Sequence, residues 1–319
     1  MSMWKRIPVS AALVIGWLGL TTGGPTAQGP VPPSQAGPVV AASAEVFQAV
    51  SQFYGYDETA PLQAISVEKR DFPNYSREKI VFTGKIVFTG IQRSRVPGYL
   101  ALPKKGTRPF PVVILIDGVG GSKDRWFTED SWPRGPLVAN GLTEAGIAVL
   151  ALDARDHGER AAENDYQAPQ FSARPADRDM IVQSIIEHRR AMDYLATRSE
   201  IDRDRIGVLG LSMGGIMTFA LSGMDPRIKA AVAGVTPIRP MKETIAIPIA
   251  PMTFAPAIAN TPILMLMGRT DSFYSEQDAQ QLLALIKSPR KELQFYDSGH
   301  RLPPEYAARG VEWLKTYLK

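Results

Sequence analysis

The sequence predicts an α/β protein with a mostly parallel central sheet, helices on both faces and an antiparallel edge at its N-terminal side. Three observations predict this fold class. After Pro111, short apolar runs alternate with amphipathic stretches, as in repeated strand–helix units. Before Pro111, β-rich segments follow one another without helices between them. Finally, residues 210–214 form a G-x-S-x-G pentapeptide between an apolar run and a helical stretch, where such turns join a strand to a helix.

Residues 1–27 have the pattern of a secretory signal peptide. Two basic residues precede an apolar stretch, 7–20, and small and turn-forming residues follow it. Ala27 suits the last position before cleavage, whereas Pro25 does not suit the position two before it. The apolar stretch is short for a membrane span, so we expect no span in the mature chain and a secreted or periplasmic protein. An uncleaved anchor is the alternative.

The rest of the chain is predicted to be a leader followed by one domain. Residues 28–42 carry four prolines and are expected to be disordered, which leaves 43–319 for the folded domain. Ser43 is placed to cap a short helix that runs through Tyr54. The β-rich segments extend over about 62–102 and are expected to form the antiparallel edge.

A tandem repeat lies within these β-rich segments. Residues 79–84 and 85–90 both read Lys-Ile-Val-Phe-Thr-Gly. Because six is even, a shift by one copy keeps every side chain on its original face of a strand. We interpret the repeat as a local duplication that a hairpin absorbs.

After Pro111, strands and helices are predicted in alternation. The predicted strands are 111–117, 147–152, 205–210, 229–235, 262–268 and 291–297. The predicted helices are 133–145, 176–198, 213–223, 275–287 and 303–318. Alternation of this kind builds a mostly parallel sheet that is covered on both faces.

Composition excludes several kinds of function. Removal of Lys5 and Arg6 with the signal peptide lowers the basic count from 36 to 34 against 32 acidic residues, and no basic run remains, so no nucleic-acid partner is expected. The chain has no cysteine, which excludes thiol catalysis and thiolate metal sites. Its three histidines are scattered and have no metal-ligand spacing, so we expect no metal and no cofactor.

Ser212 is the candidate nucleophile. It is the central residue of the pentapeptide 210–214, after a predicted strand and before a predicted helix. A serine on such a sharp turn is held with its hydroxyl exposed, and small flanking residues let the backbone bend. The alternative is a glycine-rich turn whose serine caps the next helix.

His300 is the candidate base. A serine hydroxyl needs a base within hydrogen-bond reach and a group that orients this base. His188 lies inside a predicted helix, whereas His157 and His300 each follow a predicted strand, at the sheet edge where ligands bind. In G-x-S-x-G enzymes of this architecture the chain order is Ser, acid, His, and only His300 follows Ser212.

Asp271 is the candidate acid. It follows the penultimate predicted strand, between the candidate nucleophile and base, where a carboxylate fixes the imidazole tautomer and stabilises the imidazolium. Its alternative role is to cap the helix that begins near Ser275. Asp297 lies too close in sequence to His300 for this task, and Asp278 lies inside the predicted helix.

Two backbone N–H groups are expected to form an oxyanion hole. One belongs to Met213, the residue after the nucleophile. The other belongs to Val119, in the loop 117–122, because the three glycines of this loop let the main chain approach a ligand. A phosphate cradle is the alternative for a glycine-rich loop, but no G-K-[ST] follows it.

With these motifs in order, residues 95–319 resemble the α/β-hydrolase superfamily, and within it the serine-bearing branch similar to dienelactone hydrolases and acetyl xylan esterases. The motifs that carry the resemblance are 117–121, 153–158, 210–214 and Asp271 with His300. Two residues depart from the pattern of many relatives: Asp117 stands where they have a histidine before glycine, and Asp156 where they have a glycine. Dienelactone hydrolase itself uses a cysteine, which is absent here.

Several residues are candidates for binding the substrate. Trp126 and Trp132 flank the oxyanion loop and offer rings that stack on a sugar or aromatic ring, with core or rim packing as the alternative. His157 lies at the ligand-binding edge of the sheet. Two insertions, 159–175 and 236–261, are placed to shape the pocket. The second is apolar and rich in proline, and it is either an acyl-pocket wall or lid, or ordinary surface packing.

The sequence therefore predicts a serine hydrolase that cleaves carboxylic esters through an acyl-enzyme, with a small-molecule or carbohydrate-linked ester as substrate. A peptidase of the prolyl-oligopeptidase type is one alternative, but the segment before the core is too short for the large propeller that such enzymes usually carry. A non-catalytic binding module on a hydrolase scaffold is the other alternative, and an intact serine, acid and histidine argue against it.

Overall fold

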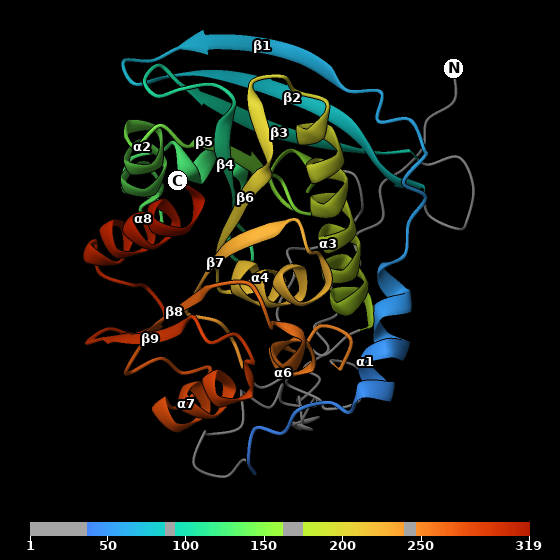
Figure 1. The fold of residues 1–319 in the computed structure, drawn as a ribbon, viewed down its shortest axis with the longest axis vertical. Helices are drawn as coiled ribbons and strands as arrows, with labels where there is room; N and C mark the ends of the chain where they lie inside the picture. The colour runs from blue at the N-terminus through green and yellow to red at the C-terminus, as the bar shows by residue number, and fades with distance from the viewer. Residues whose placement is uncertain (1–36, 87–92, 162–174, 239–246) are drawn as a thin grey trace, which may run out of the picture.

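In the part of the chain that the structure describes, a nine-stranded sheet runs through the molecule, with helices on both of its faces (Figure 1). The computed structural model describes residues 37–86, 93–161, 175–238 and 247–319. The strands are β1 (Ile65–Asp71), β2 (Tyr75–Ile86), β3 (Arg93–Pro103), β4 (Phe110–Ile116), β5 (Ala148–Leu152), β6 (Ile201–Leu211), β7 (Ile228–Gly234), β8 (Ile263–Gly268) and β9 (Lys291–Tyr296). The helices are α1 (Ala44–Ser51), α2 (Gly135–Glu144), α3 (Pro175–Ala196), α4 (Met213–Met224), α6 (Pro251–Phe254), α7 (Glu276–Leu285) and α8 (Glu305–Leu318).

The sheet has the predicted mixed topology. Its spatial order is β1-β2-β3-β5-β4-β6-β7-β8-β9. Strands β1 to β3 pair antiparallel and join the rest through an antiparallel β3–β5 pair, whereas every pair from β5 to β9 is parallel. The predicted antiparallel edge is confirmed, as are all the strands and helices predicted after Pro111. The largest shift in a boundary is in β6, which starts at Ile201 rather than 205.

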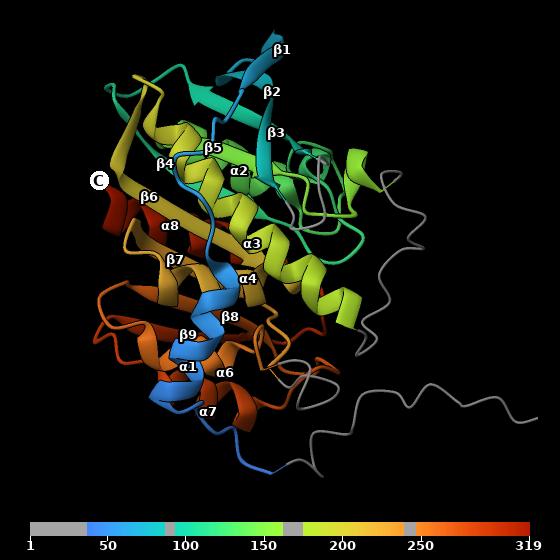
Figure 2. The same cartoon turned by 90° about the vertical axis from the view of Figure 1, so that its right-hand side faces the viewer.

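Two hydrophobic cores sandwich the sheet. One core contains side chains of α1, α3, α4, α6 and α7, and the other contains those of α2 and α8. Strand β4 supplies both, because successive side chains of a strand point to opposite faces: Val112 and Ile114 enter the first core, and Val113 and Leu115 the second. Figure 2 shows α1, α3 and α4 in front of the sheet, with α8 behind it. This double cover explains why the central strands read as continuous apolar runs.

The predicted helix cap at Ser43 is confirmed. The hydroxyl of Ser43 accepts a hydrogen bond from the Val46 N–H (3.3 Å) and caps α1. The first copy of the tandem repeat lies in β2, with Ile80 and Phe82 buried. Much of the second copy lies outside the described residues, as do the predicted signal peptide, most of the leader and parts of both insertions.

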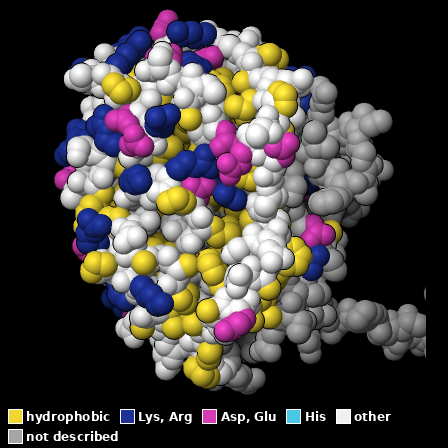
Figure 3. Space-filling view, turned by 45° about the vertical axis from the view of Figure 1, so that its right-hand side comes forward, with side chains coloured by type: hydrophobic (Ala, Val, Ile, Leu, Met, Phe, Trp, Pro, Cys, Tyr) yellow, Lys and Arg dark blue, Asp and Glu magenta, His cyan; other side chains and the backbone are white. Residues whose placement is uncertain are grey.

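The outer surface differs from one part of the sheet to another. All seven residues of the edge strand β1 are exposed, whereas all residues of β4 are buried. In Figure 3, acidic and basic side chains lie interspersed over the upper part of the face. Within the described ranges, no helix combines the length and the hydropathy needed to cross a bilayer.

Candidate active site

Ser212 lies on a strained turn between β6 and α4. Its backbone has φ 58° and ψ −116°, a region that a non-glycine residue occupies only when its surroundings enforce it. Gly214 is one such constraint, because a Cβ on this residue would lie 2.1 Å from the carbonyl oxygen of Ile116 at the end of β4. Close packing of α4 against β4 therefore fixes the turn and raises the serine above the sheet.

The Ser212 hydroxyl belongs to a hydrogen-bonded chain of three side chains. Its Oγ lies 2.8 Å from Nε2 of His300, and Nδ1 of His300 lies 2.7 Å from Oδ2 of Asp271. Ser212 occupies the N-cap position of α4, but its side chain makes no capping hydrogen bond. The helix-capping alternative is thus not what the structure shows, and the three residues selected from the sequence come together.

Asp271 is fully buried at its side chain, and its second oxygen, Oδ1, accepts the N–H of Phe273 (3.0 Å). It does not cap α7, because Ser275 does so in a capping box with Asp278. Asp297 is 93% exposed at its side chain and pairs with Arg269. Of the three carboxylates considered from the sequence, only Asp271 contacts His300.

Tyr274 packs beside this carboxylate. Its hydroxyl accepts the N–H of Gly268 (2.9 Å). Burial, together with the nearby negative charge of Asp271, raises the pKa of Tyr274 far above its usual range. A neutral phenol therefore shields the inner side of the acid from water.

Met213 and Val119, the two expected oxyanion donors, directly follow Ser212 and Gly118 in the chain. Met213 is the first residue of α4, where backbone N–H groups have no acceptor within the helix. The loop after β4 comes close to Ser212, since a Cβ on Gly118 would lie 3.1 Å from the Cβ of Ser212. Val119 follows this contact, and its side chain is partly buried against the first core.

Trp126 is not available to a substrate, which corrects the sequence-based expectation. It lies in the 3-10 helix η3 (Lys123–Trp126) and is 0% exposed, because its ring fills the second core together with Val138 and Leu142 of α2. A fully buried indole does not stack on a ligand. The tryptophan near the triad is Trp132, whose ring centroid lies 5.7 Å from that of His300.

A second aromatic ring, which the sequence did not single out, flanks His300 as well. The ring centroid of Phe273 lies 4.5 Å from that of the imidazole. Both Phe273 and Trp132 are partly exposed, and a quarter of the His300 side chain is exposed. Phe273 is two residues after the acid, so its proximity to the base follows from the Asp271–His300 contact, which no local pattern reveals.

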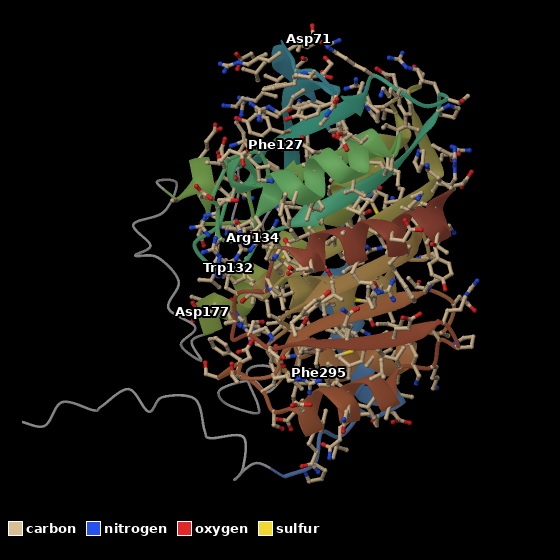
Figure 4. The ribbon with its side chains drawn as sticks, turned by 90° about the vertical axis from the view of Figure 1, so that its left-hand side faces the viewer. Asp71, Phe127, Trp132, Arg134, Asp177 and Phe295 are labelled. Carbon is tan, nitrogen blue, oxygen red and sulfur yellow. The ribbon has the colours of Figure 1, made fainter. Side chains whose placement is uncertain are left out.

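The loop that carries Trp132 is tied to the loop that carries the base. Arg301 donates to the carbonyl oxygens of Ser131 (3.1 Å) and Trp132 (3.3 Å), and Arg134 donates to that of Leu302 (3.1 Å). In Figure 4, Trp132 and Arg134 lie at the same edge of the molecule as Asp177 near the start of α3. These bonds fix the indole relative to the imidazole.

The two remaining histidines are both buried. Nδ1 of His157 lies 2.7 Å from the carbonyl oxygen of Arg155, and the side chain is 3% exposed. Its Nε2 has no partner within the described residues, and a substrate-binding role stays a prediction. Burial lowers the pKa of His188 to about 4, so this helix residue is neutral at physiological pH and serves in packing.

Comparisons with known proteins show the family and fold to which the chain is similar. The model of the dienelactone hydrolase family matches residues 96–300. Protein YtaP of Bacillus subtilis is 30% identical over 177 residues, which cover 54% of this chain and 56% of its own length. The acetyl esterase Axe7A of Xylanibacter ruminicola is 27% identical over 148 residues, 44% of this chain and 33% of its own length. The chain thus spans about half or less of these curated relatives.

Solved structures show a similar fold. The acetyl xylan esterase from Paenibacillus sp. R4 superposes with a TM-score of 0.65 and 20% identity, over 88% of this chain and 96% of its own.

Proposed function

The chain belongs to the dienelactone hydrolase family, and from that premise we propose that it is a carboxylic ester hydrolase with Ser212 as nucleophile, His300 as base and Asp271 as the acid that orients the base. The observation that carries the proposal is the hydrogen-bonded chain from Asp271 through His300 to Ser212, with links of 2.7 and 2.8 Å. These contacts provide the activated nucleophile that ester cleavage needs.

Acylation begins when Ser212 Oγ attacks the ester carbonyl carbon. Nε2 of His300 takes the hydroxyl proton, and the buried Asp271 carboxylate stabilises the imidazolium through Nδ1–H. The N–H groups of Met213 and Val119 donate to the oxyanion of the tetrahedral intermediate. His300 then returns the proton to the alkoxide oxygen as the bond from carbon to this oxygen breaks, which leaves an acyl-serine and a free alcohol.

Deacylation repeats these steps with water. His300 takes a proton from the water as its oxygen attacks the acyl carbon, and the same two N–H groups hold the second oxyanion. When this intermediate collapses, the proton passes from His300 to Ser212 Oγ, and the carboxylic acid is released. The free enzyme is restored without any cofactor.

The rings beside His300 support a substrate with a bulky alcohol part. The alcohol leaves next to Nε2, since this atom protonates it, so the groups around the exposed imidazole face the alcohol rather than the acyl chain. Trp132 and Phe273 supply two partly exposed rings there. Small-molecule or carbohydrate-linked esters with a ring in their alcohol part fit this surface.

The proposal includes export from the cytoplasm. It rests on the signal-peptide pattern of residues 1–27. Expression with and without these residues, followed by fractionation of the cells, tests it: activity outside the cytoplasm should require the segment.

Replacement of the nucleophile tests the enzymatic proposal. With p-nitrophenyl acetate as substrate, Ser212→Ala should lower kcat by about 10⁴-fold or more, while the thermal unfolding midpoint stays near that of the wild type. A panel of aryl, sugar and simple alkyl acetates should then rank the alcohol parts. Turnover of Ser212→Ala at the wild-type rate would contradict the triad, and preferential cleavage of dipeptide naphthylamides would favour the peptidase.

A further inference from the structure

Asp117, the residue that departs from the histidine of many relatives, is folded into the oxyanion loop. It is 7% exposed. Its Oδ1 accepts the N–H of Gly118 (2.7 Å), and its Oδ2 accepts the N–H of Ser122 (3.2 Å). One carboxylate thus binds both ends of the 118–122 segment from the inside.

The segment between these two bonds is a tight turn. The N–H of Gly121 donates to the carbonyl oxygen of Gly118 (3.0 Å), and Gly120 has φ +70°, as at the third position of a type II turn. Such a turn uses the first carbonyl and the fourth N–H, so the N–H of Val119 takes no part in it. The shape of the turn therefore sets the direction of the Val119 N–H.

Asp117 and Gly121 are a matched pair. A Cβ on residue 121 would lie 2.3 Å from both Cγ and Oδ2 of Asp117, so the carboxylate occupies the space that any other side chain would need. A neutral imidazole at position 117 has a single acceptor nitrogen and does not replace a carboxylate that accepts two backbone N–H groups. With aspartate in place of the usual histidine, the loop is therefore held by two hydrogen bonds to one carboxylate.

We propose that Asp117 is a positioning residue for the reaction: its carboxylate holds loop 117–122 in the shape that aims the Val119 N–H at the oxyanion above Ser212. The inference rests on the proposed function, because it needs an oxyanion at this place. It assigns Asp117 no contact with the substrate. The neighbouring Arg125 guanidinium lies 3.8 Å from Oδ2 and is the nearest positive charge to it in the described part of the chain.

The ionised form of Asp117 is the one that accepts both hydrogen bonds. Burial raises the pKa of this carboxyl to about 6, in spite of the Gly118 N–H and Arg125. The other titratable groups that face it are Asp153, at the end of β5, and Tyr306 of α8. Below pH 6 the protonated carboxyl loses acceptor capacity, and the loop should loosen. Above pH 6 the ionised carboxylate accepts both hydrogen bonds and holds the loop in place.

Asp117→Asn tests the inference, because the amide keeps the size of the side chain but presents only one acceptor oxygen. We expect kcat for p-nitrophenyl acetate at pH 8 to fall about 10- to 100-fold, with KM nearly unchanged. This decrease in kcat should not exceed the decrease caused by removal of a whole oxyanion donor. The ratio of wild-type to variant kcat should shrink below pH 6, where the wild type carries a neutral carboxyl.

Gly121→Ala is the second variant, since it displaces the carboxylate without removing it, and it should also lower kcat at nearly constant KM. The matched control is Asp225→Asn, which alters another buried carboxylate that accepts a backbone N–H at the far end of α4 and should keep kcat. The inference is overturned if folded Asp117→Asn keeps the wild-type kcat, if its deficit does not depend on pH, or if the control loses as much. Absence of ester turnover in the wild type would instead overturn the proposed function.

Discussion

The two ends of helix α4 hold polar groups in opposite ways. At its N-terminal end, Ser212 has a strained backbone, and its hydroxyl contacts His300. At its C-terminal end, Asp225 is 2% exposed. It accepts bonds from the side chains of Arg189 (3.0 Å) and Arg227 (2.7 Å) and from the backbone N–H of Arg227 (3.2 Å).

We interpret the difference as one between groups that hold the fold and groups that carry the proposed chemistry. The C-terminal end of α4 also borders a cavity of about 500 Å³, but its two cations, Lys229 and Arg290, donate to the carbonyl oxygens of Pro226 and Asn260. Size alone thus does not identify the site. At the N-terminal end, His300 contacts both Ser212 and the buried Asp271, the arrangement on which the proposed function rests.

Apart from replacement of the nucleophile, the largest effect should come from the acid. Asp271→Asn keeps the size of the side chain but favours the wrong imidazole tautomer, so kcat for p-nitrophenyl acetate should fall by about 10⁴-fold. Steady-state kinetics and a thermal melt of the same preparation measure this. If kcat stays within an order of magnitude of the wild type while the protein is folded, the chain from Asp271 to Ser212 does not drive catalysis.

A smaller and selective effect is expected from Trp132. Trp132→Ala removes a ring beside His300 and should lower kcat/KM about five- to tenfold for phenyl acetate, with little change for methyl acetate, because only the aryl alcohol part stacks on the indole. Tyr317→Ala, which removes a ring lining the far cavity, is the control. Equal losses for both acetates would mean that Trp132 supports the loop rather than the substrate.

The opposite end of α4 should show the reverse pattern. Asp225→Asn should leave kcat unchanged but lower the free energy of unfolding by about 2 kcal/mol, since the cations and the backbone N–H lose an ionised acceptor in a largely buried place. Urea denaturation monitored by fluorescence measures the loss. A fall in kcat at constant stability would break the distinction between the two ends.

The smallest effect concerns pH. Burial acts to raise the pKa of Asp225, but the hydrogen bonds and charges of Arg227 and Arg189 outweigh burial and lower this pKa below its usual value. A carboxylate of this kind stabilises the fold above the unfolded-state pKa, near 4, and this stability is lost as the pH falls through the folded-state pKa. The difference in unfolding free energy between wild type and Asp225→Asn should therefore be constant from pH 8 to 5 and shrink below pH 4.

Most of the fold could be predicted because the sheet is buried on both faces. Strands such as β4 and β8 are apolar throughout and are separated by amphipathic helices, so local patterns and long-range packing agree. The candidate triad could be predicted because chain order alone selects His300, and because the acid follows a strand that ends at the same edge as Ser212.

The surroundings of the triad depend on packing that local sequence does not encode. Trp126 and Trp132 are close in sequence to the same loop. Trp126 lies in η3 and packs in the second core, whereas Trp132 lies in the loop after η3 and contacts His300. Phe273 packs against His300 because it lies two residues after Asp271, which contacts the same imidazole. In the sequence, Asp117 is only a departure from a motif. Its two hydrogen bonds to the N–H groups of Gly118 and Ser122 follow from the fold of the loop.

The most direct test of the account is to label the nucleophile. A fluorophosphonate probe reacts with a serine only where a base activates it and an oxyanion hole receives the phosphoryl oxygen. Peptide mapping of the folded wild type should find the probe on Ser212, and His300→Ala should slow the labelling strongly while Asp225→Asn does not. Absence of label from Ser212, or an equal labelling rate in His300→Ala, would contradict the account.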